Sequence, residues 1–294
     1  MIREKQNWFV WFVVRLPFFL LALTMVLPYY FMVISSFKTV PELTAFPPTF
    51  WPKKFTTNNF YDPTPTELQH TKGLFQYFTN TDLRFFRLML NSVFIAVVSV
   101  TMQLLFASMV AYVLAKRKVP GHNVIFLLIL ASFMIPWPVT LIPNFITVFK
   151  LGWINTYQGL MVPSWVSAFA VFFLRQYMLG IPDDLVDAAR IDGASELRTW
   201  WQVIVPLTTP AMAALAVMAL LGSWNNFVWP LIISQETSMY TVPIGMAQLN
   251  GVMSQATTGA VMTGAMLASL IPMGMFLAFQ NQFVESIAVS GVKG

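Results

Sequence analysis

The sequence predicts an all-α protein that crosses a lipid bilayer six times. Of its 294 residues, 57% are hydrophobic and only 10% are charged, and the mean hydropathy is +0.66. A soluble domain could not bury this much apolar surface. The apolar residues also gather in runs of about 20, the length that a membrane-spanning helix needs. Most charged residues fall between these runs, which favours a polytopic membrane protein.

The apolar runs define the predicted transmembrane helices. Cations precede the first run as in a signal peptide, but the run is too long and no small-residue cleavage pattern follows it, so we interpret it as a signal anchor. Prolines in or beside the runs are expected to kink the helices, because each removes an amide hydrogen bond. The predicted spans are Leu16–Ser36, Leu88–Ala115, Val124–Phe145, Gly159–Tyr177, Thr209–Ile233 and Thr258–Phe279.

The chain is expected to divide near the start of the second span. Residues 1–87 hold an N-terminal segment, the first span and a long outer loop at about 37–86 that is rich in proline and aromatic residues. Residues 88–294 hold the other five predicted spans. The sequence gives no role for the long outer loop.

Cations near the ends of the spans predict the orientation of the chain. Lys and Arg are retained on the cytoplasmic side, and Arg15, residues 116–118 and Arg190 all fall on one side of the predicted bilayer. Cations in the long outer loop weigh less in this rule. Both termini and the loop after the fourth span are therefore placed in the cytoplasm. A basic rim facing anionic lipid explains the net charge of +5 without a nucleic-acid partner.

The composition argues against several kinds of chemistry. The chain has no cysteine and two histidines, which leaves little room for a metal or catalytic centre, and no Gly-x4-Gly-Lys-Ser/Thr phosphate loop occurs. We therefore expect no catalytic residue, no metal and no cofactor on this chain. An ion-coupled secondary transporter would normally carry ionisable residues inside its spans. An integral membrane enzyme would need a cluster of reactive side chains at a span end. Both stay open as alternatives.

The loop at about 181–208, between the fourth and fifth spans, predicts two short helices. Asp183 and Asp184 can cap the free amides of the first helix, and Gly193 suits the left-handed turn that ends it. Ser195 can cap a second helix that leads back toward the membrane before Pro206. A solvated amphipathic loop is the alternative interpretation of the same pattern.

This loop resembles a known motif. The run Asp187–Ala194, followed by Ile204-Val205-Pro206 and Pro210, resembles the EAA loop of binding-protein-dependent ABC importer permeases. Further stretches are similar to the carbohydrate-uptake branch of that family, and specifically to the smaller of the two maltose-transporter permeases. They are Leu27–Val33 with Ser36–Lys38, Asn91-Ser92 with Ala111-Tyr112, Met134–Pro136 with Thr140–Pro143, Leu151-Gly152, Thr156-Tyr157, Gly159-Leu160, and Trp224–Leu231.

The resemblance implies one subunit of a larger assembly in a prokaryotic cytoplasmic (inner) membrane. It implies a six-helix permease of the type I ABC importer kind, with a cytoplasmic coupling helix between helices four and five. The implied partners are a second permease that forms a heterodimer with this chain, two cytosolic ATPase subunits, an extracytoplasmic solute-binding protein and the lipid bilayer. ATP and Mg would be bound by the ATPase subunits, and this chain would not hydrolyse ATP.

The resemblance also assigns residues to ATPase docking. The helix from about Asp184 would sit in a cleft of an ATPase subunit, where Asp187 pairs with a basic group and the small alanines permit close approach. Asp187 departs from the family, in which Glu is usual, and its shorter side chain reaches less far. The implied docking residues are Asp184, Asp187, Ala188, Ala189, Arg190, Asp192 and Gly193.

A few amide and tryptophan side chains in the spans are candidates for the substrate path. They offer hydrogen-bonding groups and aromatic faces, which suit the hydroxyls and the CH face of a sugar. Interfacial anchoring by tryptophan and hydrogen bonding between helices by the amides are the alternative roles. The candidates are Trp137, Asn144, Trp224, Asn225 and Asn226, with Asn91 and Gln103 also considered.

Overall fold

The computed structural model describes residues 11–61, 73–80, 84–117, 119–251 and 258–291. The chain forms two compact units. Unit 1 comprises the chain up to Arg84 together with Met246–Leu270, and unit 2 comprises Phe85–Gly245 together with the chain from Ile271. Residues 62–72 of the predicted outer loop and position 118 of the basic segment lie outside the described residues.

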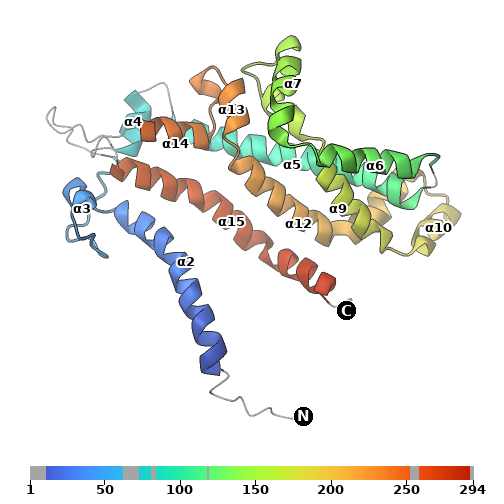
Figure 1. Ribbon diagram of the computed structural model, residues 1–294, viewed down its shortest axis with the longest axis horizontal. Coiled ribbons are helices and arrows are strands. Elements are labelled where there is room, and N and C mark those ends of the chain that lie inside the picture. Colours follow the sequence, from blue (N-terminus) through green and yellow to red (C-terminus); the bar gives the residue numbers. More distant parts are fainter. Residues whose placement is uncertain (1–10, 62–72, 81–83, 118, 252–257, 292–294) are drawn as a thin grey trace. The chain divides into compact units, whose positions relative to one another are not determined.

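Every regular element of the described residues is a helix, which confirms the predicted fold class (Figure 1). Four stretches are long and apolar enough to cross a membrane, and two bent helix pairs bring the number to six if each pair counts as one span. The four stretches are Leu16–Ser35 (α2), Phe85–Lys116 (α5), Glu196–Trp224 and Thr258–Ala278, the last within α15 (Thr258–Gly291).

Unit 1 is organised around the end of α2. The side-chain amide of Asn59 donates to the backbone carbonyls of Ser36 (3.0 Å) and Lys38 (2.7 Å), which fixes the outer loop against this end. The first turn of α15 approaches the same amide so closely that a Cβ on Gly259 would lie 2.1 Å from Asn59 Oδ1. Unit 1 also contains the short helices η1 (Trp11–Arg15), α3 (Val40–Thr44) and α4 (Leu74–Asn80).

The helix α3 is held by a carboxylate. The side chain of Glu42 accepts hydrogen bonds from the backbone N–H groups of Lys53 (2.5 Å) and Thr39 (3.5 Å), and it completes a capping box with Thr39. The hydrogen bond from the Lys53 amide is the main reason that the pKa of Glu42 lies below its usual value. The ionised carboxylate therefore stabilises this part of the loop.

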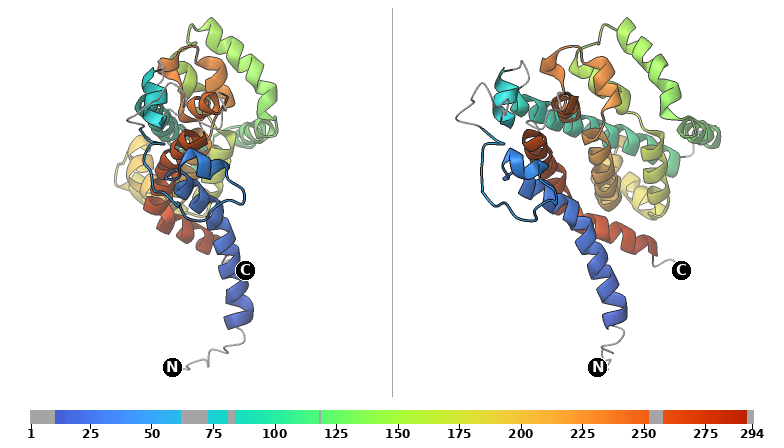
Figure 2. Two further views of the ribbon diagram at one scale, coloured as in Figure 1. Left: turned by 90° about the vertical axis from the view of Figure 1, so that its left-hand side faces the viewer. Right: turned by 60° about the vertical axis from the view of Figure 1, so that its left-hand side comes forward.

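Unit 2 is built on α5. This helix packs mainly on α9 (Ala168–Leu179) and α12 (Val205–Trp224) (Figures 1 and 2). Small buried side chains at the contacts, including Ala107, Ala111 and Ala170, let the helices approach closely. Leu174, Ile204 and Leu215 fill the same core.

Two predicted spans are bent, in line with the kinks expected from their prolines. The third divides into α6 (His122–Phe133) and α7 (Trp137–Lys150), which make an angle of 98°. Pro136 is the N-cap of α7 and is extended, with ψ of 134°. It has no amide donor, and the residue before a proline disfavours the helical region, so α6 ends before Pro136. Figure 1 shows α7 turned away from α6.

The fourth predicted span is bent less sharply. It consists of α8 (Tyr157–Met161) and η2 (Val162–Ser164), followed after a break by α9 at an angle of 42°. The hydroxyl of Ser167 accepts a hydrogen bond from the amide of Ala170 and so starts α9 anew.

The fifth predicted span was wrong at both ends. Its helical run begins at Glu196, with α11 (Glu196–Thr199) and the π-helix η3 (Trp200–Ile204) leading directly into α12. The helix therefore continues through Pro206, since a wider π turn accommodates a residue that has no amide donor. It ends at Trp224, and α13 (Val228–Ile233), η4 (Thr237–Met239) and α14 (Val242–Gly251) follow as separate helices.

Candidate functional site

The segment between α9 and α12 contains a short helix with well-defined ends. Helix α10 (Asp183–Ile191) ends at a Schellman turn, in which the amides of Gly193 and Ala194 donate to the carbonyls of Arg190 (3.0 Å) and Ala189 (2.9 Å). Gly193 has a φ of 76°, as the sequence predicts. The hydroxyl of Ser195 accepts from the amide of Arg198 and caps α11, also as predicted.

The start of α10 differs from the prediction. Pro182 is the N-cap and no side-chain hydrogen bond caps the helix, so Asp183 and Asp184 act there through their charge in the first turn. Asp183 forms an ion pair with Lys116 (2.7 Å) at the end of α5. The Lys116 ammonium also donates to the carbonyl of Ile181, which gives this nearly buried cation two partners.

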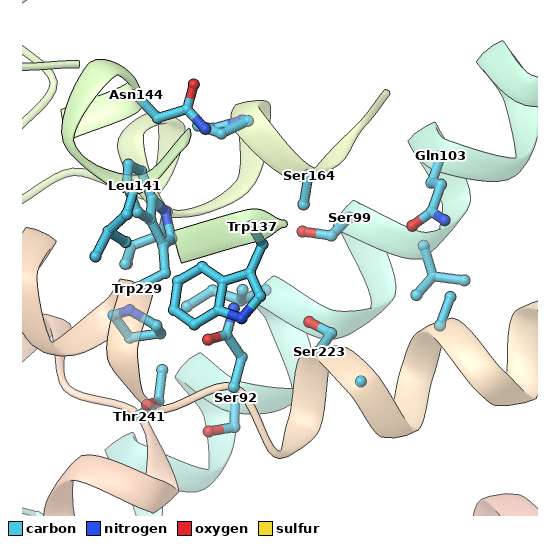
Figure 3. A pocket seen from close by; sticks show the side chains of 18 of the residues that line it. Ser92, Ser99, Gln103, Trp137, Leu141, Asn144, Ser164, Ser223, Trp229 and Thr241 are labelled. Atoms are coloured by element: carbon cyan, nitrogen blue, oxygen red, sulfur yellow. The ribbon is translucent and has the colours of Figure 1, made fainter. Parts of the chain in front are cut away.

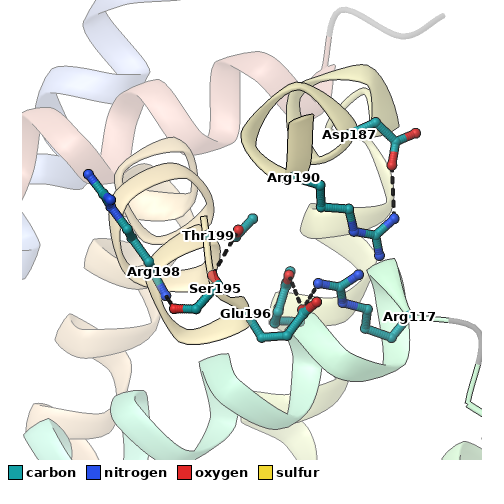
Figure 4. Close-up of polar contacts among 8 residues, drawn as sticks. Arg117, Asp187, Arg190, Ser195, Glu196, Arg198 and Thr199 are labelled. Atoms are coloured by element: carbon teal, nitrogen blue, oxygen red, sulfur yellow. Dashed lines mark hydrogen bonds and ion pairs between the residues drawn. The ribbon is translucent and has the colours of Figure 1, made fainter. Parts of the chain in front are cut away.

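A second ion pair joins α11 to α5. The carboxylate of Glu196 pairs with Arg117 and accepts a hydrogen bond from the hydroxyl of Tyr112 (3.1 Å), as Figure 4 shows. The Arg117 guanidinium lies 5.5 Å from the centre of the Tyr112 ring. Both short helices of the segment are therefore fastened to the same end of α5.

Helix α10 has an exposed face where docking is expected. The side chain of Asp187 is 61% exposed and pairs with Arg190 in the same helix, at 2.9 Å. Ala188 is exposed beside it. Ile191 is 86% exposed, which is unusual for a large apolar side chain, and Leu185 is also exposed. Neither apolar residue stands out in the sequence as a docking residue, although the helical pattern of the segment contains both.

Unit 2 also contains a pocket of about 440 Å³ (Figure 3). Of the predicted path residues, Trp137, Asn144 and Asn226 line it, together with Gln103. Trp224 is 6% exposed and lies in the core, and neither Trp224 nor Asn225 lines the pocket. The hydroxyl residues on the wall were missed: Ser92, Ser99, Thr140, Ser164, Ser223 and Thr241.

Two polar residues near the pocket hold the fold together. The amide of Asn91 donates to the carbonyls of Ser238 and Tyr240, both at 2.9 Å, and its oxygen accepts from the hydroxyl of Tyr157 at 2.7 Å. The indole of Trp229 donates to the carbonyl of Gly159 at 3.0 Å. Asn91 thus connects helices, in line with the alternative role considered for the amides.

Comparisons with known proteins extend over the whole chain. Residues 103–286 match the family described as "Binding-protein-dependent transport system inner membrane component". The arabinooligosaccharides transport system permease protein AraQ of Bacillus subtilis is 33% identical over 295 residues and 100% of each chain. AraQ of Halalkalibacterium halodurans is 41% identical over 205 residues, covering 69% of this chain and 73% of the relative.

A relative with another named substrate is also similar. The sn-glycerol-3-phosphate transport system permease protein UgpE of Yersinia enterocolitica is 33% identical over 207 residues, covering 70% of this chain and 74% of the relative. Among solved structures, a bacterial ABC transporter involved in the import of the acidic polysaccharide alginate matches with a TM-score of 0.75 and 20% identity. That match covers 96% of this chain and 99% of the other, and it shows a shared fold.

The family match, the relative that aligns over the full length and the solved structure of the same fold all agree. The chain belongs to the family of inner-membrane components of binding-protein-dependent transport systems.

Proposed function

We propose that this chain is one of the two permease subunits of an ATP-driven sugar importer. Two of the relatives above are named for arabinooligosaccharide transport and one solved neighbour is a transporter for alginate. The proposed partners are a second permease, two cytosolic ATPase subunits that bind ATP and Mg, and a solute-binding protein. A second solved neighbour is an alginate ABC transporter in complex with a substrate-bound periplasmic protein, which supports the last of these partners.

The single observation that carries the proposal is the way α10 and α11 are fastened to α5. The ion pairs Lys116–Asp183 and Arg117–Glu196 join both short helices to one end of this span. Helix α11 also continues through η3 into α12. A displacement of α10 by an ATPase subunit would therefore move α5 and α12 together, as a rigid-body transition requires.

The same two spans line the pocket. Ser99 lies 17 residues before Lys116 in α5, which corresponds to about 25 Å along the helix axis. A displacement of α10 at the cytoplasmic face would thus change the shape of a pocket deep in the membrane. ATP would drive the transition between two conformations of the complex if the ATPase subunits bind ATP more tightly in one of them.

The remaining proposals come from the sequence. Asp184, Asp187, Ala188, Ala189, Arg190, Asp192 and Gly193 form the proposed docking segment, with both chain termini on the same, cytoplasmic side. Residues 88–294 are the proposed transport core, and residues 1–87 hold the N-terminal segment, the first span and the outer loop. We propose that the chain itself catalyses no reaction and holds no cofactor.

Co-purification tests the proposal. The affinity-tagged chain, extracted from its native membrane, is expected to bring an ATPase with it, and the complex should hydrolyse ATP faster when sugar-loaded binding protein is added. A chain that purifies alone, and whose transport depends on an ion gradient, would support a secondary transporter instead.

A further inference from the structure

Two hydroxyl groups in the wall of the pocket are buried without a hydrogen-bond partner. Ser99 is 3% exposed and Thr241 is 4% exposed, and the hydroxyl oxygen of each lacks a partner. Other hydroxyls of α5 donate to a carbonyl of their own helix, Thr101 to Val97 and Ser108 to Leu105. Leaving a buried hydroxyl unpaired is unfavourable. Both oxygens are almost inaccessible in this conformation, so a ligand would pair with them, and remove this penalty, after a small shift of the pocket wall.

The rest of the wall indicates the chemistry of that ligand. The indole rings of Trp137 and Trp229 supply aromatic faces, and Gln103, Asn144 and Asn226 supply amides (Figure 3). Among the described residues, none of those that line the pocket is charged. Hydroxyls and amides pair with the hydroxyls of a sugar, and an aromatic face packs on its CH groups. A phosphate or carboxylate would lose its hydration here without meeting a cation.

We propose that this pocket binds part of a neutral sugar, and that it disfavours sugars that carry a phosphate or a carboxylate. Its volume of about 440 Å³ is near the lower end of the range of about 300–1,000 Å³ for small-ligand sites, so it has room for about one or two sugar rings. This inference rests on the proposed function as a sugar importer. It narrows the substrate to a class that differs from the glycerol phosphate and acidic alginate named for two of the similar proteins.

Gly222 offers a way to fill the pocket without disturbing the packing. It lies in α12 and lines the pocket, and a Cβ added there would meet nothing within 4 Å. A leucine at this position would project into open space. Gly274 in α15 is a matched control, because a Cβ there also meets nothing within 4 Å and Gly274 does not line the pocket.

The test uses the assembled complex in lipid nanodiscs, without the solute-binding protein. Saturation-transfer difference NMR is recorded with L-arabinose, D-glucose, D-galactose and arabinotriose, and with sn-glycerol 3-phosphate and an alginate trisaccharide. We expect signals from at least one neutral sugar in the unaltered complex and in Gly274→Leu, and their loss in Gly222→Leu. The two charged ligands should give no signal above background.

Removing the unpaired hydroxyls is a milder test. Ser99→Ala and Thr241→Val delete groups that bond to nothing in the protein, so the fold should be kept. Each is expected to weaken binding of the neutral sugar about fivefold, as the loss of one hydrogen bond does. Unchanged binding in both of these variants and in Gly222→Leu would overturn the proposal.

Two further results would also overturn it: no binding of any neutral sugar, or equal binding of a charged one. The proposed function fails separately, if the unaltered chain brings no ATPase into the complex. If the complex assembles and hydrolyses ATP in every variant, but Gly222→Leu binds sugar as the unaltered complex does, only the proposal that this pocket binds sugar would be refuted.

Discussion

Asp187 is the acidic residue on which docking to an ATPase subunit is expected to depend most. In the isolated chain its carboxylate pairs with Arg190 across one turn of the exposed helix α10. An exposed pair of this kind contributes about 0–1 kcal/mol, so Asp187 can exchange Arg190 for a cation on a partner at little cost. The observed pair therefore leaves the Asp187 carboxylate available to a partner.

Replacing Asp187 with Lys should prevent ATPase binding while leaving the chain in the membrane. Reversing a charge in a buried contact costs about 2–5 kcal/mol, so the amount of co-purified ATPase should fall at least about 30-fold. The matched control is Glu236→Lys, which makes the same change at an exposed position between α13 and η4. Equal ATPase recovery from both variants would rule out the assigned role of Asp187.

Gly193 gives a test of conformation without a change of charge. Its φ of 76° is unfavourable for a residue with a Cβ, but a Cβ there would meet no atom within 4 Å. Gly193→Val should therefore destabilise the turn by about 1–2 kcal/mol through backbone strain alone. Gly193→Asn should be tolerated better, since Asn adopts this conformation more readily. We expect sugar uptake by reconstituted complexes to fall in the first variant and largely to persist in the second; equal uptake would contradict this.

At the scale of elements, the ion pair between α11 and α5 is expected to transmit motion. Glu196→Gln removes the charge that holds Arg117 and keeps a side chain of similar size. Because the Glu196 side chain is 63% exposed, the loss of stability should be about 1 kcal/mol or less. ATP hydrolysis should continue, while uptake per ATP falls about fivefold, the factor that corresponds to about 1 kcal/mol. Uptake and hydrolysis that change in parallel would show that the pair does not couple them.

The helix α3 should loosen in acid. Since the pKa of Glu42 is lowered in the folded protein, its contribution to stability is present at neutral pH and is lost as the pH falls from the usual value near 4.5 through the lowered one. The protection of the Thr39 and Lys53 amides, which is the exchange rate relative to the intrinsic rate at each pH, should therefore fall over this range. Glu42→Gln should show fast exchange already at neutral pH. Exchange that is the same in both proteins at every pH would show that the carboxylate does not hold this loop.

Local signals in the sequence predicted the docking segment better than the pocket. The turn at Gly193 and the cap at Ser195 depend on residues next to each other in the chain, and the structure confirms both. The prolines of the third run predicted a kink but not its angle of 98°, because an apolar run shows the length of a span and not its direction. The passage of α12 through Pro206 was missed because the π-helix that allows it has no recognised local signature.

The pocket residues were only partly predictable, for a different reason. Trp137, Asn144 and Asn226 stand out as polar or aromatic groups in apolar runs, and they do line the pocket. Ser99 and Thr241 do not stand out, because a hydroxyl in a span usually bonds to a carbonyl of its own helix. Their lack of a partner appears only once α5 and the segment before α14 are folded together.

At the scale of the whole molecule, the central claim is that α10 faces the cytoplasm and contacts an ATPase subunit. The chain contains no cysteine, so a single introduced cysteine is the only thiol on it that can be labelled. Ala188→Cys places it on the exposed face of α10, and Gln235→Cys places it at an exposed position that our orientation puts outside the cell.

The most direct measurement is thiol cross-linking of these two variants in intact membranes, combined with a membrane-impermeant thiol reagent added from outside. We predict that Ala188→Cys cross-links to an ATPase subunit and is protected from the external reagent, whereas Gln235→Cys reacts with it and forms no such cross-link. Labelling of Ala188→Cys from outside, without a cross-link to an ATPase, would contradict the account.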